Sequence, residues 1–381
     1  MDDFQVFAKP VGASCNLACS YCYYLDKSEL LAESGIQRMA EELLELYIIQ
    51  HIQASSEQTI FFSWHGGEPT LAGLGYFLRI VELQKKHLPV GRSIINGIQT
   101  NGTLLNEEWC RFLKNENFIV GISIDGPERF HSINRFRKDG KSSFDDVLRG
   151  FQLLKDYQIP CEILCVVHAG NVRFPLEVYR FFKSLNAEFL TFIPLVEHFY
   201  SGNKLVSDRT VPAKAFGEFL CVIFDEWKTT DIGAVKIQIF EEALRTAFGL
   251  EHSLCIFKPV CGRVPVIEHN GDFYSCDHFV DQAHLVGNIQ NKILGDMLES
   301  PQQQAFGKAK LNSLPEYCLK CGVVSMCNGA CPKDRFIETP DGEPGLNYLC
   351  EGYKLFFNYC KPFVKEVARV WNSPIPNPSP K

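Results

Sequence analysis

The segment Ser14–Tyr24, which reads SCNLACSYCYY, places three cysteines within one short stretch of the chain. These are Cys15, Cys19 and Cys22, and the next cysteine along the chain is Cys110. A structural zinc ion or an electron-carrying iron–sulfur cluster normally takes four protein ligands. Three thiolates on one loop therefore indicate a metal centre with one coordination position left open, as catalytic metal centres have.

Length and composition exclude several classes of protein. The 381 residues suffice for one large domain and a smaller one, and no apolar run is long enough to span a membrane. A net charge of −7 argues against a nucleic-acid partner. The N-terminal MDDFQVFAKP lacks the basic start and apolar core of a signal peptide. Sixteen cysteines in such a chain predict metal or redox chemistry in the cytoplasm rather than a disulfide framework.

Short β-branched or aromatic runs alternate with helix-like patterns as far as about residue 230. The expected strands cover residues 4–10, 59–66, 93–100, 118–125, 161–168 and 189–196. Six strand–helix units predict a parallel α/β sheet that forms a partial (β/α)6 TIM-like barrel, open on one side. Working residues of such folds lie on loops at the carboxyl ends of the strands. We therefore expect one site to be built from CNLACSYC, HGGEP, QTNG, SIDGP, VVHAG and PLVE.

The composition of the sequence changes near residues 235 to 250. We expect a barrel over residues 1–235, a small cysteine-rich domain over 236–370 and a disordered tail over 371–381. The segment 269–279, HNGDFYSCDHF, predicts a hairpin with an Asn-Gly turn. Eight cysteines suffice for two four-ligand sites, of zinc or of iron and sulfur: Cys255, Cys261, Cys276, Cys318, Cys321, Cys327, Cys331 and Cys350.

The HGGEP loop offers a second part of a ligand site. Gly66 and Gly67 would let the backbone approach a ligand closely, and Glu68 could pair with an ammonium group. With the three-cysteine loop and Tyr21 just before Cys22, this motif makes the chain resemble the radical S-adenosylmethionine (SAM) enzymes. In that family SAM occupies the open position of a [4Fe–4S] cluster. A reduced cluster cleaves it to methionine and a 5′-deoxyadenosyl radical.

The second half resembles a SPASM domain, which holds two auxiliary [4Fe–4S] clusters. The resemblance assigns the first of these to Cys255, Cys261, Cys276 and Cys331. It assigns the second to Cys318, Cys321, Cys327 and Cys350, although the sequence alone leaves Cys360 open in place of Cys350. Nearly the whole chain, including SCDHFV and CNGACPKDRF, resembles the anaerobic sulfatase-maturating enzymes.

This resemblance implies oxidation of a Cys or Ser side chain in an unfolded or nascent sulfatase to Cα-formylglycine. It also implies an external one-electron donor, a flavodoxin or a ferredoxin. Another SPASM enzyme that crosslinks peptides through thioether or carbon–carbon bonds is the first alternative. A non-catalytic iron–sulfur or zinc module is the second.

Residue roles follow from the same resemblance. Around SAM it places Tyr21, Gly67, Ser123, Arg135 and Leu195. It makes Asp277 the base, whereas an aspartate after a turn more often caps backbone amides.

Other residues invite weaker assignments. We expect Asp125, in SIDGP, to be a turn residue. The resemblance places His65 toward the substrate, where other members carry Gln before GGEP, and this departure leaves the choice between Cys and Ser open. Tyr24, Gln99 and His198 are expected peptide contacts, with ordinary packing as the alternative.

Overall fold

Strands β1 to β7 run parallel and lie side by side in chain order, as the sequence predicts for six of them. The computed structural model describes residues 4–24, 27, 38–199 and 204–371. The bounds of these strands are β1 (Phe7–Ala8), β2 (Thr59–Trp64), β3 (Ser93–Thr100), β4 (Ile119–Ser123), β5 (Cys161–Val167), β6 (Phe189–Pro194) and β7 (Lys236–Ile237).

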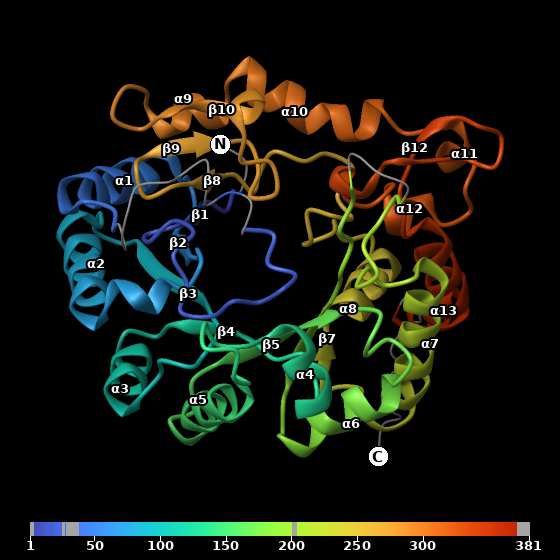
Figure 1. Ribbon diagram of the computed structural model, residues 1–381. Coiled ribbons are helices and arrows are strands. Elements are labelled where there is room, and N and C mark those ends of the chain that lie inside the picture. Colours follow the sequence, from blue (N-terminus) through green and yellow to red (C-terminus); the bar gives the residue numbers. More distant parts are fainter. Residues whose placement is uncertain (1–3, 25–26, 28–37, 200–203, 372–381) are drawn as a thin grey trace, which may run out of the picture.

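Helices surround the outer side of this curved sheet (Figure 1). They are α1 (Glu41–Ala54), α2 (Leu74–His87), α3 (Glu107–Asn115), α4 (Glu128–Asn134), α5 (Phe144–Asp156), α6 (Pro175–Ser184) and α7 (Ala213–Thr230). Local signals define their ends. The Asn106 side chain accepts a hydrogen bond from the Trp109 amide and caps α3, and Pro175 begins α6. Buried strand residues such as Phe62 and Ile122 pack beneath these helices.

The cysteine-rich half extends the same sheet on the β1 side. Strand β8 (Val266–Ile267) pairs in parallel with β1, and β9 (Asp272–Tyr274) and β10 (Leu285–Asn288) follow in antiparallel fashion, which makes ten strands. The predicted hairpin is confirmed, and Gly271 takes the positive φ of +87° that its turn requires. Strands from both sides of residue 235 therefore belong to one sheet.

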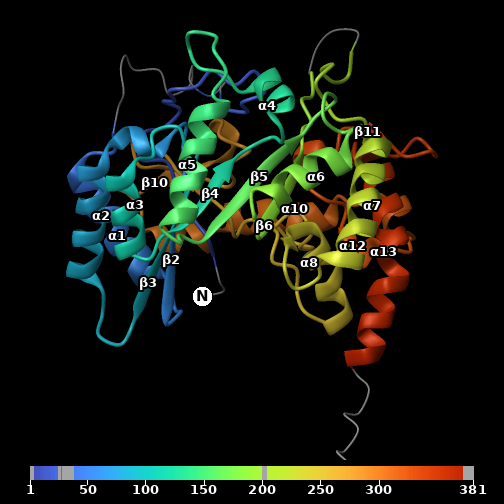
Figure 2. The ribbon, with the colours of Figure 1, turned by 90° about the horizontal axis from the view of Figure 1, so that it is seen from below.

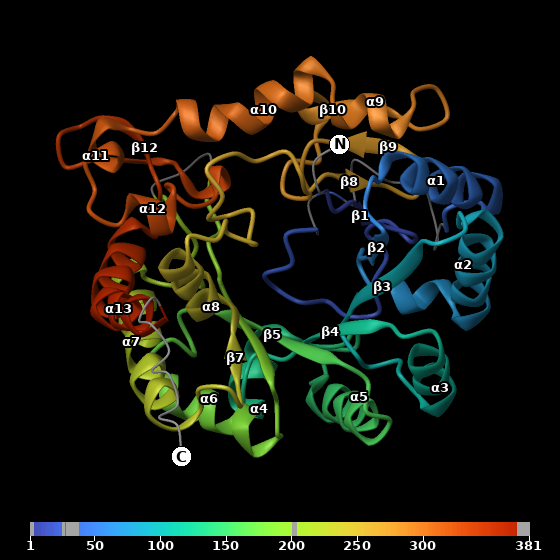
Figure 3. The same cartoon turned by 180° about the vertical axis from the view of Figure 1, so that it is seen from behind.

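Apart from short 3₁₀ turns, the remaining elements are short helices, a two-stranded antiparallel sheet and one long helix. They are α8 (Gln238–Arg245), α9 (Leu294–Leu298), α10 (Pro301–Asn312), α11 (Glu316–Leu319), α12 (Val324–Cys327), β11 (Ile337–Glu338), β12 (Pro344–Leu346) and α13 (Cys350–Trp371). Helix α13 packs against α7 of the barrel (Figures 1 and 3). Trp371, the first residue of the expected tail, is the last of α13, and residues 372–381 lie outside the described part. No helix in the described ranges is long and apolar enough to cross a bilayer.

Candidate active site

The three-cysteine loop follows β1 and is held by the segment after α4. Ala18 and Ser20 donate backbone hydrogen bonds to the carbonyl oxygens of Phe136 and Asn134, at 2.8 and 2.9 Å. The blue loop after β1 and helix α4 accordingly lie at the same edge of the molecule (Figure 2). This is the edge at which the parallel strands end, where the sequence predicts the site.

The thiols of this loop lie close together in a partly buried setting. Burial raises the pKa of Cys15 to about 12 and that of Cys19 to about 11. The charges of Cys19 and Cys22 both act on Cys15, so all three belong to one group. The Leu17 amide donates a hydrogen bond to the Cys15 sulfur at 3.4 Å. Three neighbouring thiols with a backbone donor suit an iron–sulfur cluster with one open position, because the irons of such a cluster are ligated separately.

The two glycines of HGGEP fit against the cysteine loop. The Gly67 amide donates to the carbonyl oxygen of Gly12, and the Glu68 amide donates to that of Ser14, both at 2.8 Å. A Cβ atom at Gly67 would lie 2.2 Å from the Ser14 oxygen. Gly66 has a φ of +137°. The backbone of this loop therefore comes as close to the cysteine loop as the sequence predicts.

The Glu68 side chain is bound within the protein. One carboxylate oxygen accepts from the hydroxyls of Thr70 and Thr100, at 2.6 and 2.7 Å. The other accepts from the Asn101 amide at 2.7 Å. Burial raises the pKa of Glu68, and these donors oppose the rise. Glu68 thus joins the loops that follow β2 and β3, and its role toward a ligand amine stays a prediction.

Asp125 connects three segments of the site. Its carboxylate accepts from the Tyr21 hydroxyl at 2.5 Å, from Arg135 Nε at 3.1 Å and from the Val166 amide at 3.0 Å. The prediction that Asp125 is merely a turn residue is wrong, because its buried side chain orients two expected SAM contacts. A turn motif gives no hint of such distant partners.

Two more expected SAM contacts lie at strand ends. Ser123 ends β4, and its hydroxyl accepts a hydrogen bond of 3.2 Å from the Gln99 amide on β3. Leu195 follows β6 directly and is buried. These residues share the edge of the sheet that carries the cysteine loop.

Asp277 reaches the barrel from the cysteine-rich half. One carboxylate oxygen lies 2.7 Å from Lys9 Nζ, and the other accepts from the Tyr23 hydroxyl at 2.5 Å. Burial opposes ionisation of Asp277, but Lys9, His278 and Lys27 outweigh it and hold its pKa well below the usual value. Within the described part, these carboxylate contacts are with side chains, so Asp277 does not act as a backbone cap.

The expected peptide contacts lie around this carboxylate and across the barrel mouth. His65 Nε2 is 2.9 Å from the Ser63 hydroxyl, and its ring stacks on Phe7 with centroids 3.9 Å apart. His198 stacks on Phe336 at 4.0 Å.

Tyr24 has an acidic partner that the sequence analysis missed. Its hydroxyl donates to the buried Glu268, and the Lys9 ammonium lies 4.4 Å from its ring centroid. Burial raises the pKa of Glu268 to about 7. Lys9 and Glu268 follow no motif, so only their position in the fold brings them to Asp277.

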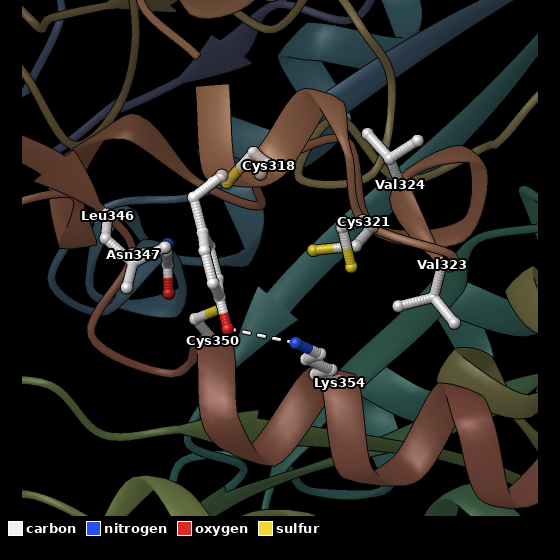
Figure 4. Close-up of a pocket in the computed structure, with 11 residues that line it drawn as sticks. Cys318, Cys321, Val323, Val324, Leu346, Asn347, Cys350 and Lys354 are labelled. Carbon is white, nitrogen blue, oxygen red and sulfur yellow. Dashed lines mark hydrogen bonds between the residues drawn. The ribbon is translucent and has the colours of Figure 1, made fainter. Parts of the chain in front are cut away.

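The eight downstream cysteines form two groups. In the first, the charges of the cysteines act on one another: Cys255, Cys261, Cys276 and Cys331. The second group lines a pocket whose empty space, with the part open to solvent, is about 390 Å³ (Figure 4): Cys318, Cys321, Cys327 and Cys350. Burial raises the pKa of the Cys327 thiol to about 12 and that of Cys350 to about 11.

Cys360 lies elsewhere on α13. It is fully buried, its thiol contacts the carbonyl oxygen of Phe357 at 3.6 Å, and the thiol that influences its pKa is that of Cys221. Among the described residues, no three His, Cys, Asp or Glu side chains converge on a point within reach of a single metal ion. The groups thus consist of three, four and four thiols, with Cys350 rather than Cys360 in the last.

Comparison with known proteins identifies both parts of the chain. Residues 10–181 match the model of the radical SAM superfamily, and residues 260–322 match that of an iron-sulfur cluster-binding domain, SPASM. A serine-type anaerobic sulfatase-maturating enzyme of Bacteroides thetaiotaomicron is 44% identical, with 94% of this chain and 90% of that protein covered. A cysteine-type enzyme of Clostridium perfringens is 34% identical, with 97% and 99% covered.

Solved structures agree with this result. The structure of native anSMEcpe with bound AdoMet superimposes with a TM-score of 0.87 at 34% identity, over 96% of this chain and 99% of that one. Streptococcus suis SuiB bound to S-adenosylmethionine, at 15% identity and a TM-score of 0.61, shares the fold. The prediction of a radical SAM fold with a SPASM domain is confirmed, and the chain belongs to the anaerobic sulfatase-maturating enzymes, a group of radical SAM enzymes.

Proposed function

We propose that this protein oxidises a Cys or Ser side chain of a sulfatase polypeptide to Cα-formylglycine. The hydrogen bond between Tyr23 and Asp277 carries the proposal. Tyr23 follows Cys22 of the N-terminal thiol group, and Asp277 follows Cys276 of the first downstream group. One partly buried contact therefore joins the part that would start a radical reaction to the part that would accept an electron.

The thiol groups suit three [4Fe–4S] clusters, one that binds SAM and two auxiliary ones. The proposed ligands are Cys15, Cys19 and Cys22 for the first, Cys255, Cys261, Cys276 and Cys331 for the second, and Cys318, Cys321, Cys327 and Cys350 for the third. When bound, SAM and its cluster would supply a one-electron cleavage whose product removes a hydrogen atom from the substrate Cβ.

The protein's own residues would position SAM. Arg135, held by Asp125 through Nε, would present its remaining N–H groups to the SAM carboxylate. The backbone at Gly66 and Gly67 would face the SAM amine. Tyr21, Ser123 and Leu195 would line the rest of the site, with Glu68 in support.

Asp277 would take the proton that leaves the substrate. Once Cβ has lost a hydrogen atom and an electron is departing, the substrate S–H or O–H becomes strongly acidic. A carboxylate of low pKa can accept such a proton, and Asp277 is held ionised by Lys9. We place the substrate side chain between Asp277 and the contacts Tyr24, His65, Gln99 and His198.

The proposal also assigns a role to each domain, an electron donor and a cellular compartment. Residues 1–235 would form the SAM-binding barrel and 236–370 the auxiliary domain. A flavodoxin or ferredoxin would supply electrons. All sixteen cysteines are free, which suits a reducing compartment, so we propose that the protein acts in the cytoplasm.

A peptide assay tests this function. Reconstituted enzyme, SAM and a reductant are incubated anaerobically with three sulfatase-motif peptides that carry Cys, Ser or Ala at the target position. We expect an aldehyde that reacts with a hydrazide on the Cys peptide, the Ser peptide or both, and none on the Ala peptide. Cleavage of SAM with no aldehyde on either reactive peptide would contradict the proposal. Loss of two hydrogens without an aldehyde would favour the crosslinking alternative.

A further inference from the structure

Two cations inside the cysteine-rich half have no acidic partner in the part of the chain that the structure describes. Lys310 on α10 is 1% exposed, and its ammonium donates to the carbonyl oxygens of Cys255 and Ile256, both at 2.8 Å. Arg335 is partly buried and donates only to backbone carbonyls and to one hydroxyl. Within the described ranges, no ion pair links either side chain to an aspartate or a glutamate, whereas the neighbouring Lys333 pairs with Asp334 at 2.6 Å.

Arg335 lies between the two downstream thiol groups. Its Nε and Nη2 atoms donate to the carbonyl oxygens of Gly329 and Asn328, both at 2.9 Å. These residues form part of the short connection from Cys327, in one group, to Cys331, in the other. A further Nη1 bond of 2.6 Å to the Lys310 carbonyl ties the guanidinium to the helix that carries the second cation.

Among the described residues, the largest opposing electrostatic effects on these two cations come from cysteines. Burial lowers the pKa of Arg335, and the thiolates of both groups oppose this effect, Cys318 and Cys327 from one and Cys261 and Cys331 from the other. Burial also lowers the pKa of Lys310, and Cys261, Cys255 and Cys331 of the first downstream group oppose that effect. A buried charge is costly unless an opposite charge compensates it. Thiolate-bound clusters would supply that compensation.

We propose that Arg335 and Lys310 are the internal countercharges of the two auxiliary clusters and raise their reduction potentials. A cluster gains negative charge when it takes up an electron, so a nearby fixed cation stabilises the reduced form more than the oxidised form. In the proposed function an auxiliary cluster would accept the one electron that the substrate radical loses, and Asp277 would accept the proton. This inference rests on the clusters of the proposed function.

The reduction potentials provide the test. The full-length reconstituted protein, without peptide, is titrated with dithionite in the presence of redox mediators and followed by electron paramagnetic resonance. We expect Arg335→Gln and Lys310→Gln each to lower the equilibrium constant for auxiliary-cluster reduction at least tenfold, or about 59 mV for one electron. The signal that changes when SAM is added serves as an internal reference and should keep its potential.

Two further variants separate charge from structure. Arg335→Lys keeps the charge but loses the planar donor group, so its potentials should stay close to those of the wild type. Lys320→Gln removes a cation next to Cys321, but Lys320 is 74% exposed and paired with Glu316, so solvent should screen its loss.

Several outcomes would overturn the inference. They are unchanged potentials in Lys310→Gln, an equal shift in Arg335→Lys and Arg335→Gln, an equal shift in Lys320→Gln, or wild-type protein without auxiliary iron. If Arg335→Gln loses its iron, Lys310→Gln alone decides the matter. Failure to produce formylglycine would contradict the proposed function and leave these potentials unaffected, so the two failures are distinguishable.

Discussion

Gly67 lies against the carbonyl oxygen of Ser14. A Cβ atom at Gly67 would be only 2.2 Å from that oxygen, so a side chain has no room there. Gly67→Ala should therefore displace the cysteine loop. We expect loss of SAM cleavage and of the iron bound there, with a destabilisation of about 1–3 kcal/mol. Iron analysis and a SAM-cleavage assay would measure the effect.

Gly75 on α2 provides the matched control. A Cβ atom at Gly75 would meet nothing within 4 Å, and the residue is exposed. Gly75→Ala should thus keep iron and activity and be neutral or mildly stabilising. Equal losses in both variants would show that the Gly67–Ser14 contact is not responsible.

Joint replacement of Cys15, Cys19 and Cys22 by Ala should abolish SAM cleavage and leave the auxiliary clusters bound. Iron should fall by one third, from about 12 to about 8 atoms per chain, because each cubane holds four irons. Iron and sulfide analysis checks this. Complete loss of iron, or surviving SAM cleavage, would contradict the assignment of these three cysteines as ligands of the SAM-binding cluster.

Cys350 and Cys360 lie less than three turns apart on α13, but their replacement should have different effects on iron content. Cys350→Ala should lose the cluster of the cavity that Cys350 lines, because one of its four thiols is gone. Cys360→Ala should keep all iron and lose stability by about 1 kcal/mol, as expected when a small buried side chain is shortened. Iron content and thermal unfolding of the two variants decide between them. The reverse pattern would make Cys360 the ligand.

Asp277→Asn should reduce formylglycine formation by about 10²- to 10⁴-fold while SAM cleavage continues. It should also destabilise the protein by about 3–5 kcal/mol, because Lys9 is fully buried and loses its counterion. Tyr23→Phe removes the other contact without a change of charge and should cause the smaller loss. Aldehyde and 5′-deoxyadenosine measured in one reaction report both effects. Wild-type yields of both products per folded molecule would exclude Asp277 as the base.

Because of Glu268, the free energy of unfolding should fall as pH rises. Burial raises its pKa from 4.5 to about 7, so folding favours its protonated form. The contribution of Glu268 is fully present below pH 4.5 and is lost as pH approaches 7. Glu268→Gln cannot ionise and should exceed the wild type in unfolding free energy by on the order of 3 kcal/mol at pH 8, and by much less at pH 5. Denaturation at both pH values, with the exposed Glu338→Gln as control, measures this.

Much of the barrel could be predicted because its strands carry a strong local signal. The runs at 59–64 and 93–100 are apolar, bounded by polar loops and long enough to show their pattern. Strands β7 and β8 have two residues each, which is too short for any periodicity. The sequence therefore predicts the hairpin but not its pairing with β1.

The thiol groups could be predicted because ligand spacing is itself a sequence pattern. The charged partners could not. Lys9 meets Asp277 only after the hairpin of β8 and β9 pairs with β1, and Arg335 lies in a loop whose sequence motif indicates only its cysteines. Contacts between residues remote in the chain depend on tertiary packing, which no local pattern records.

Because β1 pairs in parallel with β8, the sheet around β1 is completed only late in synthesis at the ribosome. The three-cysteine loop emerges early, yet its strand has only β2 as a neighbour until residues 266–267 leave the exit tunnel. The same late hairpin brings Asp277 toward Lys9. We therefore expect a nascent or truncated chain to carry its first three thiols on an incompletely supported strand. Competence to start radical chemistry would thereby depend on completion of the half that we propose receives the electron.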